Sequence, residues 1–104
     1  MIEEITLTDE SGWTDAFFPE TRDIMLKGNF NVSVNGDTWT GSIKLQRRYH
    51  EIKASENWEK TNWRDVLVFT LNSEQTVEEP EKGVSYRLGT DIPITGTVNL
   101  RLSY

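Results

Sequence analysis

The sequence predicts an all-β fold, an antiparallel β-sandwich or jelly-roll-like barrel of six to eight strands. The segments 83–89 and 95–104 alternate apolar and polar residues with a period of two, as strands do when one face is buried and the other wet. β-Branched and aromatic residues dominate the other extended segments, and no amphipathic helix of useful length interrupts them. Doubled or closed antiparallel sheets bury two inner faces and leave few free edges, so we expect one of these arrangements.

The length and composition indicate one domain. The chain has 104 residues, which predicts a single β domain over residues 1–104 with residues 1–22 as a partly irregular N-terminal segment. It contains no cysteine, so disulfide bonds and thiolate metal sites are excluded. We expect neither a signal peptide nor a membrane span, because Ile-Glu-Glu follows Met1 and no apolar run approaches the ~20 residues of a membrane helix.

The charge argues against a nucleic-acid partner. The formal net charge is −6, whereas a surface that binds phosphates needs clustered cations. Basic side chains gather in one segment only, which also has acidic residues beside it; they are Lys44, Arg47, Arg48, His50 and Lys53. We interpret this segment as a solvated strand face and loop. An acidic excess keeps a protein soluble and suits docking on a basic surface.

The first third of the chain contains two predicted strands. Residues 2–8 form the first, with Ile5 and Leu7 facing inward, and a turn follows it. The aromatic segment 13–19 is expected to be irregular. A long extended segment then reaches residue 35, and Gly28 within it is expected to mark a bulge or a close backbone approach.

The strongest turn signal lies in the middle of the chain. Asn35-Gly36-Asp37 predicts a hairpin, because Asn-Gly tolerates the positive φ that both central positions of a type I′ turn require. The return strand is predicted over residues 38–49. Its apolar face is interrupted by Arg47, so we expect that face to reach water or a partner there. Residues 51–62 are polar and charged and form a long loop or a helical turn.

The last third supplies most of the predicted core. Residues 63–71 are apolar on both faces and predict a central strand, whereas residues 72–82 are acidic and contain Pro80, which ends any strand there. The alternating segments 83–89 and 95–104 are the two final strands. The expected core combines large apolar side chains from these strands, namely Leu67, Phe69, Tyr86, Leu88, Val98 and Leu100.

The residues that carry most enzyme chemistry are scarce, so we expect no catalytic activity and no cofactor. His50 is the single histidine, and no Gly-x-Ser-x-Gly elbow accompanies it. A zinc site needs several His or Cys ligands, and no calcium-binding Asp-x-Asp-x-Asp-Gly loop or Gly-rich phosphate loop occurs. The acidic run around Pro80 is interpreted as a solvated loop rather than a pair of glycosidase carboxylates.

The aromatic residues point to binding. Trp39 and Trp63 lie on predicted strands and are assigned to the core, whereas the other two tryptophans lie in loops, where large rings serve as partner contacts. The expected partner-binding residues lie in the N-terminal segment, the end of the return strand and the charged loop; they are Trp13, Phe17, Phe18, Arg47, Tyr49 and Trp58. Two alternatives remain open. The rings cap the protein's own core, or exposed rings stack on sugars as in a carbohydrate-binding β-sandwich module.

Residues 30–104 resemble a family of small virion proteins of tailed bacteriophages. The similar segments are Gly-Ser-Ile-Lys-Leu-Gln-Arg-Arg at 41–48, Trp-Arg-Asp-Val at 63–66, Glu-Pro-Glu-Lys-Gly-Val-Ser-Tyr-Arg-Leu at 79–88 and Gly-Thr-Val-Asn-Leu-Arg-Leu at 96–102. In the family a short Gly-rich turn joins the first two of these segments. Here that link is longer, charged and free of glycine, which is consistent with a specific contact loop.

The resemblance implies a structural role in a phage particle. The expected function is that of a capsid decoration or cement protein, which binds the outside of the assembled head and stabilises it. A head–tail or tail-fibre adaptor of the same virion is the alternative. The implied partners are the major capsid protein or a neighbouring virion protein, with a homo-oligomer also open, and the implied location is the virion. No nucleic-acid or membrane partner is expected.

Overall fold

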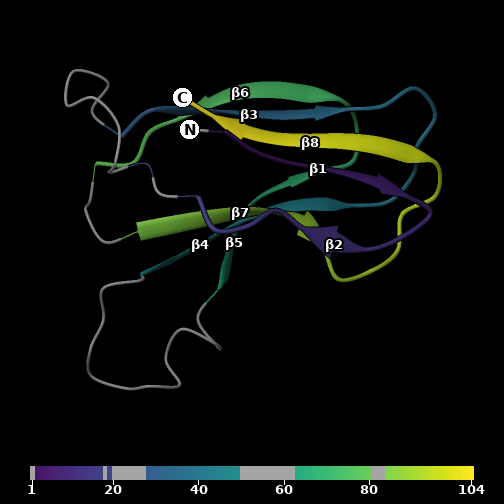
Figure 1. The fold of residues 1–104 in the computed structure, drawn as a ribbon, viewed down its shortest axis with the longest axis horizontal. Coiled ribbons are helices and arrows are strands. Elements are labelled where there is room, and N and C mark those ends of the chain that lie inside the picture. Colours follow the sequence, from purple (N-terminus) through teal and green to yellow (C-terminus); the bar gives the residue numbers. More distant parts are fainter. Residues whose placement is uncertain (1, 18, 20–27, 50–62, 81–83) are drawn as a thin grey trace.

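The structure is a computed structural model that describes residues 2–17, 19, 28–49, 63–80 and 84–104. Two antiparallel sheets of four strands each form two layers (Figure 1). One sheet has the order β1-β8-β3-β6 and the other β2-β7-β4-β5. The strands are β1 (Ile2–Thr8), β2 (Gly12–Trp13), β3 (Phe30–Asn35), β4 (Ile43–Tyr49), β5 (Arg64–Phe69), β6 (Ser73–Val77), β7 (Val84–Thr90) and β8 (Thr97–Ser103).

The topology is that of a jelly roll. The first strand pairs with the eighth, the second with the seventh, the third with the sixth and the fourth with the fifth, all antiparallel. This is the pattern of a long hairpin rolled into a double sheet. The predicted all-β sandwich is therefore confirmed, and the order of the strands shows the jelly-roll form of it.

The core fills the space between the two sheets. The inward residues of β3 and β8 are almost completely buried, and those of β4 and β7 meet them from the opposite sheet. Phe69, Tyr86, Leu88, Val98 and Leu100 are buried as predicted, and Leu67 is half-buried against the same core. Ile94, in the connection between β7 and β8, is also buried in it.

The predicted hairpin at Asn35-Gly36-Asp37 is wrong. β3 pairs with β6 and β8, and β4 belongs to the other sheet, so the chain crosses between layers here instead of turning back on itself. Gly36 does not have a positive φ. Its peptide group is instead bound by the side chain of Asn72, which accepts from the Gly36 N–H at 2.9 Å and donates to the Gly36 carbonyl at 2.8 Å. Asn72 also accepts from the Trp39 indole N–H at 2.8 Å. Trp39 packs against the core, as expected.

Two predictions about the third quarter of the chain are also wrong. β5 is an edge strand rather than a central one, and Val66 and Val68 are 42% and 56% exposed. Its pairing with β4 shifts register beside Leu45, which leaves a bulge that blunts this edge. β6 follows and pairs with β3 before Pro80. The acidic run around Pro80 was expected to be solvated, but its Glu79 is buried.

Gly28 is a close backbone approach, as predicted. It has a φ of 85°, and a Cβ at this position would lie 1.6 Å from the Glu79 carbonyl oxygen. Only glycine fits there. The contact sets Glu79 against the end of the sandwich.

Among the described residues, no helix is long and apolar enough to cross a membrane.

Candidate protein-binding surface

The six residues expected to bind a partner do not form one group. Phe18 and Trp58 lie outside the described residues, and for Tyr49 the structure describes only the backbone, which ends β4 opposite Val84. Trp13 is half-buried on β2. The remaining two expected contacts, Phe17 and Arg47, both face the inside of the sandwich.

Phe17 belongs to the core, which corrects the expectation that it is an exposed anchor. Its side chain has no exposed surface, and its ring centroid lies 5.2 Å from that of Phe30 and 5.4 Å from that of Tyr104. Its backbone forms a bridge with Tyr86, with N···O distances of 2.8 and 2.9 Å. Residues 12–17 therefore run along the edge of β7, and this part of the N-terminal segment is bonded to its own sheet.

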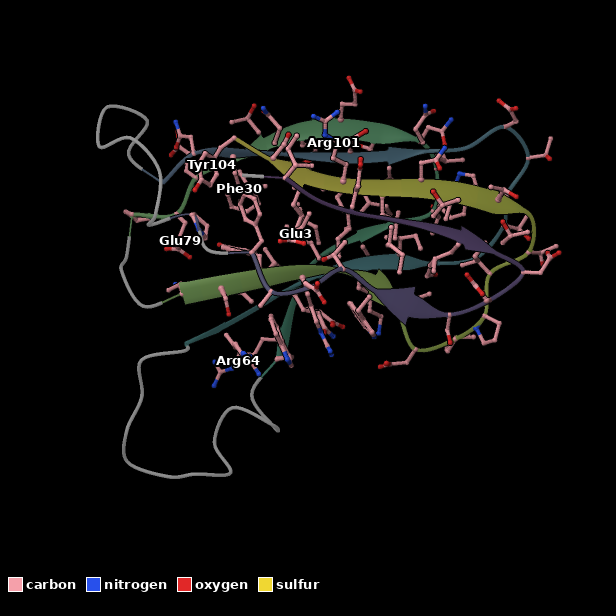
Figure 2. The ribbon with its side chains drawn as sticks, viewed as in Figure 1. Glu3, Phe30, Arg64, Glu79, Arg101 and Tyr104 are labelled. Carbon is pink, nitrogen blue, oxygen red and sulfur yellow. The ribbon has the colours of Figure 1, made fainter. Side chains whose placement is uncertain are left out.

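Arg47 is part of a buried ionic group at the end of the sandwich. Its guanidinium is paired with the buried carboxylate of Glu79, to which the Tyr86 hydroxyl also donates at 2.8 Å. Burial raises the pKa of Tyr86 above its ordinary value, and the bond to the carboxylate raises it further. Figure 2 shows Glu79 at the same end of the molecule as Phe30 and Tyr104. The geometry gives Arg47 a structural role, as the partner of a buried acid.

Trp13 is held in place on the outer side of the second sheet. Its indole N–H donates to Asp91 at 2.8 Å, and the Arg87 guanidinium lies over its ring, 3.9 Å from the centroid. Arg87 comes from β7, where the alternation directs it away from the core. Burial lowers the pKa of Arg87, an effect that the nearby Asp91 opposes.

Trp63 lies on the same outer face, which corrects its assignment to the core. Its ring is contacted by Arg87 at 4.6 Å and by Arg48 at 4.4 Å. Arg87 thus contacts both tryptophans, although they are fifty positions apart in the sequence. The sequence could not show this pairing, because it depends on β2 and β5 flanking the β7–β4 pair.

A polar chain extends this arrangement across the sheet. The Arg87 Nε donates to Gln46 Oε1 at 2.8 Å, and the Gln46 Nε2 donates to Asp65 at 2.8 Å. Lys44 lies 3.3 Å from the other oxygen of the same carboxylate. The hydrogen bond from Gln46 lowers the pKa of Asp65, and Lys44 adds to the effect. Arg87, Gln46 and Asp65 lie side by side on three neighbouring strands, because Gln46 is paired with both of the others.

We name this outer face the Arg87 surface and define it by Trp13, Lys44, Gln46, Arg48, Trp63, Asp65, Val68 and Arg87. Val68 pairs with Lys44 and adds an exposed apolar side chain beside the polar chain. The arrangement combines two aromatic rings, three cations and one carboxylate on neighbouring strands of one sheet. Side chains of these types, held in fixed positions, suit recognition of another protein.

Among the described residues, no group of three or more His, Asp or Glu side chains is placed to hold a metal. His50 lies outside the described residues.

The chain has no significant match to a protein-family model, to a curated protein or to a solved structure. The assignment of a function therefore depends on the geometry of the chain itself and on the sequence resemblance described above.

Proposed function

We propose that this protein is a structural component of a tailed-bacteriophage particle, a decoration protein that docks on the outside of the assembled head through its Arg87 surface. The setting comes from the resemblance of residues 30–104 to small phage virion proteins. The choice of docking surface is supported by the contacts of Arg87 with Trp13 and Trp63. The proposed role is non-enzymatic, and binding to the assembled shell but not to its free subunits would stabilise the shell by mass action.

The observation that carries the proposal is the contact of Arg87 with Trp13 and Trp63. Tryptophan and arginine are the side chains most enriched at the centres of protein interfaces. Here their geometry is fixed before binding, by the hydrogen bonds to Asp91 and Gln46. A surface that is ordered in advance loses less conformational entropy on association. Val68 supplies apolar area at the rim.

The fold is compatible with the proposal but does not select it. Jelly rolls occur in viral capsid domains and also in lectins, so function has to be argued from the surface. The Arg87 surface does not suit the sugar-stacking role considered for the tryptophans. The Arg87 guanidinium lies over both rings, and a sugar would have to compete for those faces.

The first experiment measures the copy number of the chain in purified phage particles. Quantitative mass spectrometry gives this number as a ratio to the copies of the major capsid protein. A decoration protein should be present in a fixed ratio to the capsid lattice. A ratio that corresponds to a single ring at one vertex would favour a head–tail or tail-fibre adaptor. Absence of the chain from the particles would overturn the proposal.

The second experiment tests the docking surface itself. Val68→Glu places a charge on the Arg87 surface, and Ile92→Glu is the matched control in the exposed connection after β7. Both side chains are largely exposed, so neither change should alter the melting temperature much. We expect Val68→Glu to reduce loading on particles at least tenfold and Ile92→Glu to load normally. Equal loading of the two variants would refute docking through this face.

A further inference from the structure

The outer face of the other sheet is hollowed and polar. Two adjoining hollows of about 450 and 410 Å³ lie on it, and both are lined by Ser33 and Arg101. Figure 2 labels Arg101 on the outer side of this sheet, away from the β2-β7-β4-β5 layer. Polar outward residues are ordinary in an antiparallel sheet. Two features distinguish this face: the hollows, and the hydrogen-bond donors in them that have no partner among the described residues.

Arg101 lies at the centre of a row that crosses all four strands. It pairs with Glu4 of β1 on one side and with Ser33 of β3 on the other, and Ser33 pairs in turn with Glu74 of β6. Despite these neighbours, Arg101 makes no ion pair or hydrogen bond with another described residue. Its five N–H donors form a planar fork that remains available to a ligand.

The amide side chains on either side of this row are also only half used. Asn99 accepts from Thr6 at 2.8 Å and Asn31 accepts from Thr76 at 3.1 Å, in each case through the side-chain oxygen. These bonds orient the two amides. Within the described part of the chain, neither side-chain nitrogen has a hydrogen-bond partner of its own. The face thus presents oriented donors from Asn31 and Asn99, an unpaired guanidinium from Arg101, and acceptors from the two flanking carboxylates.

We propose that this face binds a neutral, hydroxyl-rich saccharide chain that lies across β1, β8, β3 and β6. A sugar hydroxyl both donates and accepts, so it matches a surface on which N–H donors lie between two flanking carboxylates. The carboxylates of Glu4 and Glu74 outnumber the one guanidinium, so the hollows have a net negative charge. The whole chain is also acidic, with a net charge of −6. A polyanionic ligand would be repelled.

The expected affinity of one site is low. The outward residues of this sheet include no aromatic ring on which a sugar could stack; they are Ile2, Glu4, Thr6, Thr8, Asn31, Ser33, Asn35, Glu74, Thr76, Thr97, Asn99, Arg101 and Ser103. Binding by hydrogen bonds alone from water gives little net free energy. We therefore expect a dissociation constant on the order of 1 mM. Many copies displayed on one particle would raise the effective affinity by avidity.

This inference goes beyond the proposed docking role and does not depend on it. The saccharide face and the Arg87 surface belong to opposite layers of the sandwich, so both can be occupied at once (Figure 1). Failure of saccharide binding would leave the docking experiments unaffected, and failure of docking would leave this face to be tested on the purified chain.

The test is a titration of the ¹⁵N-labelled full chain with neutral oligosaccharides, followed by amide chemical shifts. The probes are malto-, cello-, manno- and chito-oligosaccharides, each added to about 10 mM, a concentration well above the expected dissociation constant. Oligogalacturonate serves as the anionic comparator. We expect at least one neutral probe to shift the amides of β3 and β8, and the anionic comparator to shift them less.

Three variants assign the effect to the site. Arg101→Leu should weaken binding at least tenfold, and Arg101→Lys should restore little of it, because a point charge lacks the planar fork. Arg64→Leu removes an exposed arginine on the other sheet and should bind as the unaltered chain does. Melting temperatures of all three establish that they fold.

Three results would overturn the inference. The first is that no neutral probe shifts the resonances of β3 and β8. The second is that the shifts cluster instead around Trp13 and Trp63, which would place the sugar on the opposite face. The third is tighter binding of oligogalacturonate than of any neutral probe, which would make the hollow an anion site.

Discussion

Strands β7 and β8 have the same alternating pattern and different surroundings. Each lies inside its sheet with a hydrogen-bonded neighbour on both edges. The outward residues of β8 are largely exposed, whereas β7 is covered on both faces and its Ser85 is fully buried. The difference arises from side chains of other strands, because Trp13 and Trp63 lie on the outer face beside Arg87. Alternation therefore determines which residues point outward, and tertiary neighbours determine whether those residues meet water.

The largest expected effect concerns the inward faces of β7 and β8, which are buried in both strands. Leu88 and Leu100 are both fully buried between the sheets. Leu88→Ala and Leu100→Ala should each lower the free energy of unfolding by about 2–5 kcal/mol, through lost transfer free energy and the cavity left behind. Urea denaturation measures this. A loss below about 1 kcal/mol for either variant would contradict the buried position of that strand.

The second effect concerns the hydroxyl of Tyr86, which lies in β7. Tyr86→Phe removes a hydrogen bond to the buried Glu79 carboxylate and should cost about 1.5–3 kcal/mol near pH 7. The pKa of Tyr86 is raised in the folded state, so above pH ~10 the unfolded chain ionises first and the unaltered protein loses stability.

The difference in stability between the unaltered protein and Tyr86→Phe should therefore shrink as the pH rises above about 10. Urea denaturation across pH 7–11 measures it. Tyr104→Phe is the matched control, because it removes a hydroxyl beside β8 and leaves the Tyr86–Glu79 bond in place. A difference that grew with pH would show that the hydroxyl does not donate to Glu79.

The third effect separates the outward faces of the two strands. Arg87→Ala removes the guanidinium that contacts both tryptophans and should cost about 1–2 kcal/mol. Arg101→Ala removes an arginine without such contacts and should change stability by no more than about 0.5 kcal/mol. Tryptophan fluorescence should change in the first variant only. Equal costs for the two variants would mean that the two outer faces do not differ as described.

The sequence was sufficient to locate most strands and the core. The alternation in β1, β3, β7 and β8 reflects a local property of the backbone, so the residues that face inward were predicted correctly. The jelly-roll-like form was also among the predicted arrangements, because two stacked sheets bury the inner faces of many short strands.

The pairing of strands could not be predicted in the same way. The Asn35-Gly36-Asp37 signal is local, and what decides its conformation is Asn72, which binds the Gly36 peptide from another part of the chain. β5 has apolar residues on both faces and was placed in the centre of a sheet, but its outer valines are exposed beside a bulge. Hydrophobicity alone does not distinguish a core strand from an edge strand with an apolar outer face.

The candidate surface was found only in part for the same reason. Trp13 was singled out because large rings outside predicted strands suit contact roles, but its neighbours Arg87 and Trp63 join it through the registers of four strands. Phe17 looked similar in the sequence and lies in the core. The signal that could have linked Trp63 and Arg87 was their shared outward parity, which becomes informative once the strand order is known.

Hydroxyl-radical footprinting of the chain, both free and on purified particles, can show whether the Arg87 surface docks on a protein assembly. Val68 on the Arg87 surface is 56% exposed, and Ile2 on the opposite outer face is 51% exposed, so the two aliphatic side chains are matched reporters. We predict strong protection of Val68, Trp13 and Trp63 on the particle and unchanged oxidation of Ile2. Protection of Ile2 with continued oxidation of Val68 would contradict it.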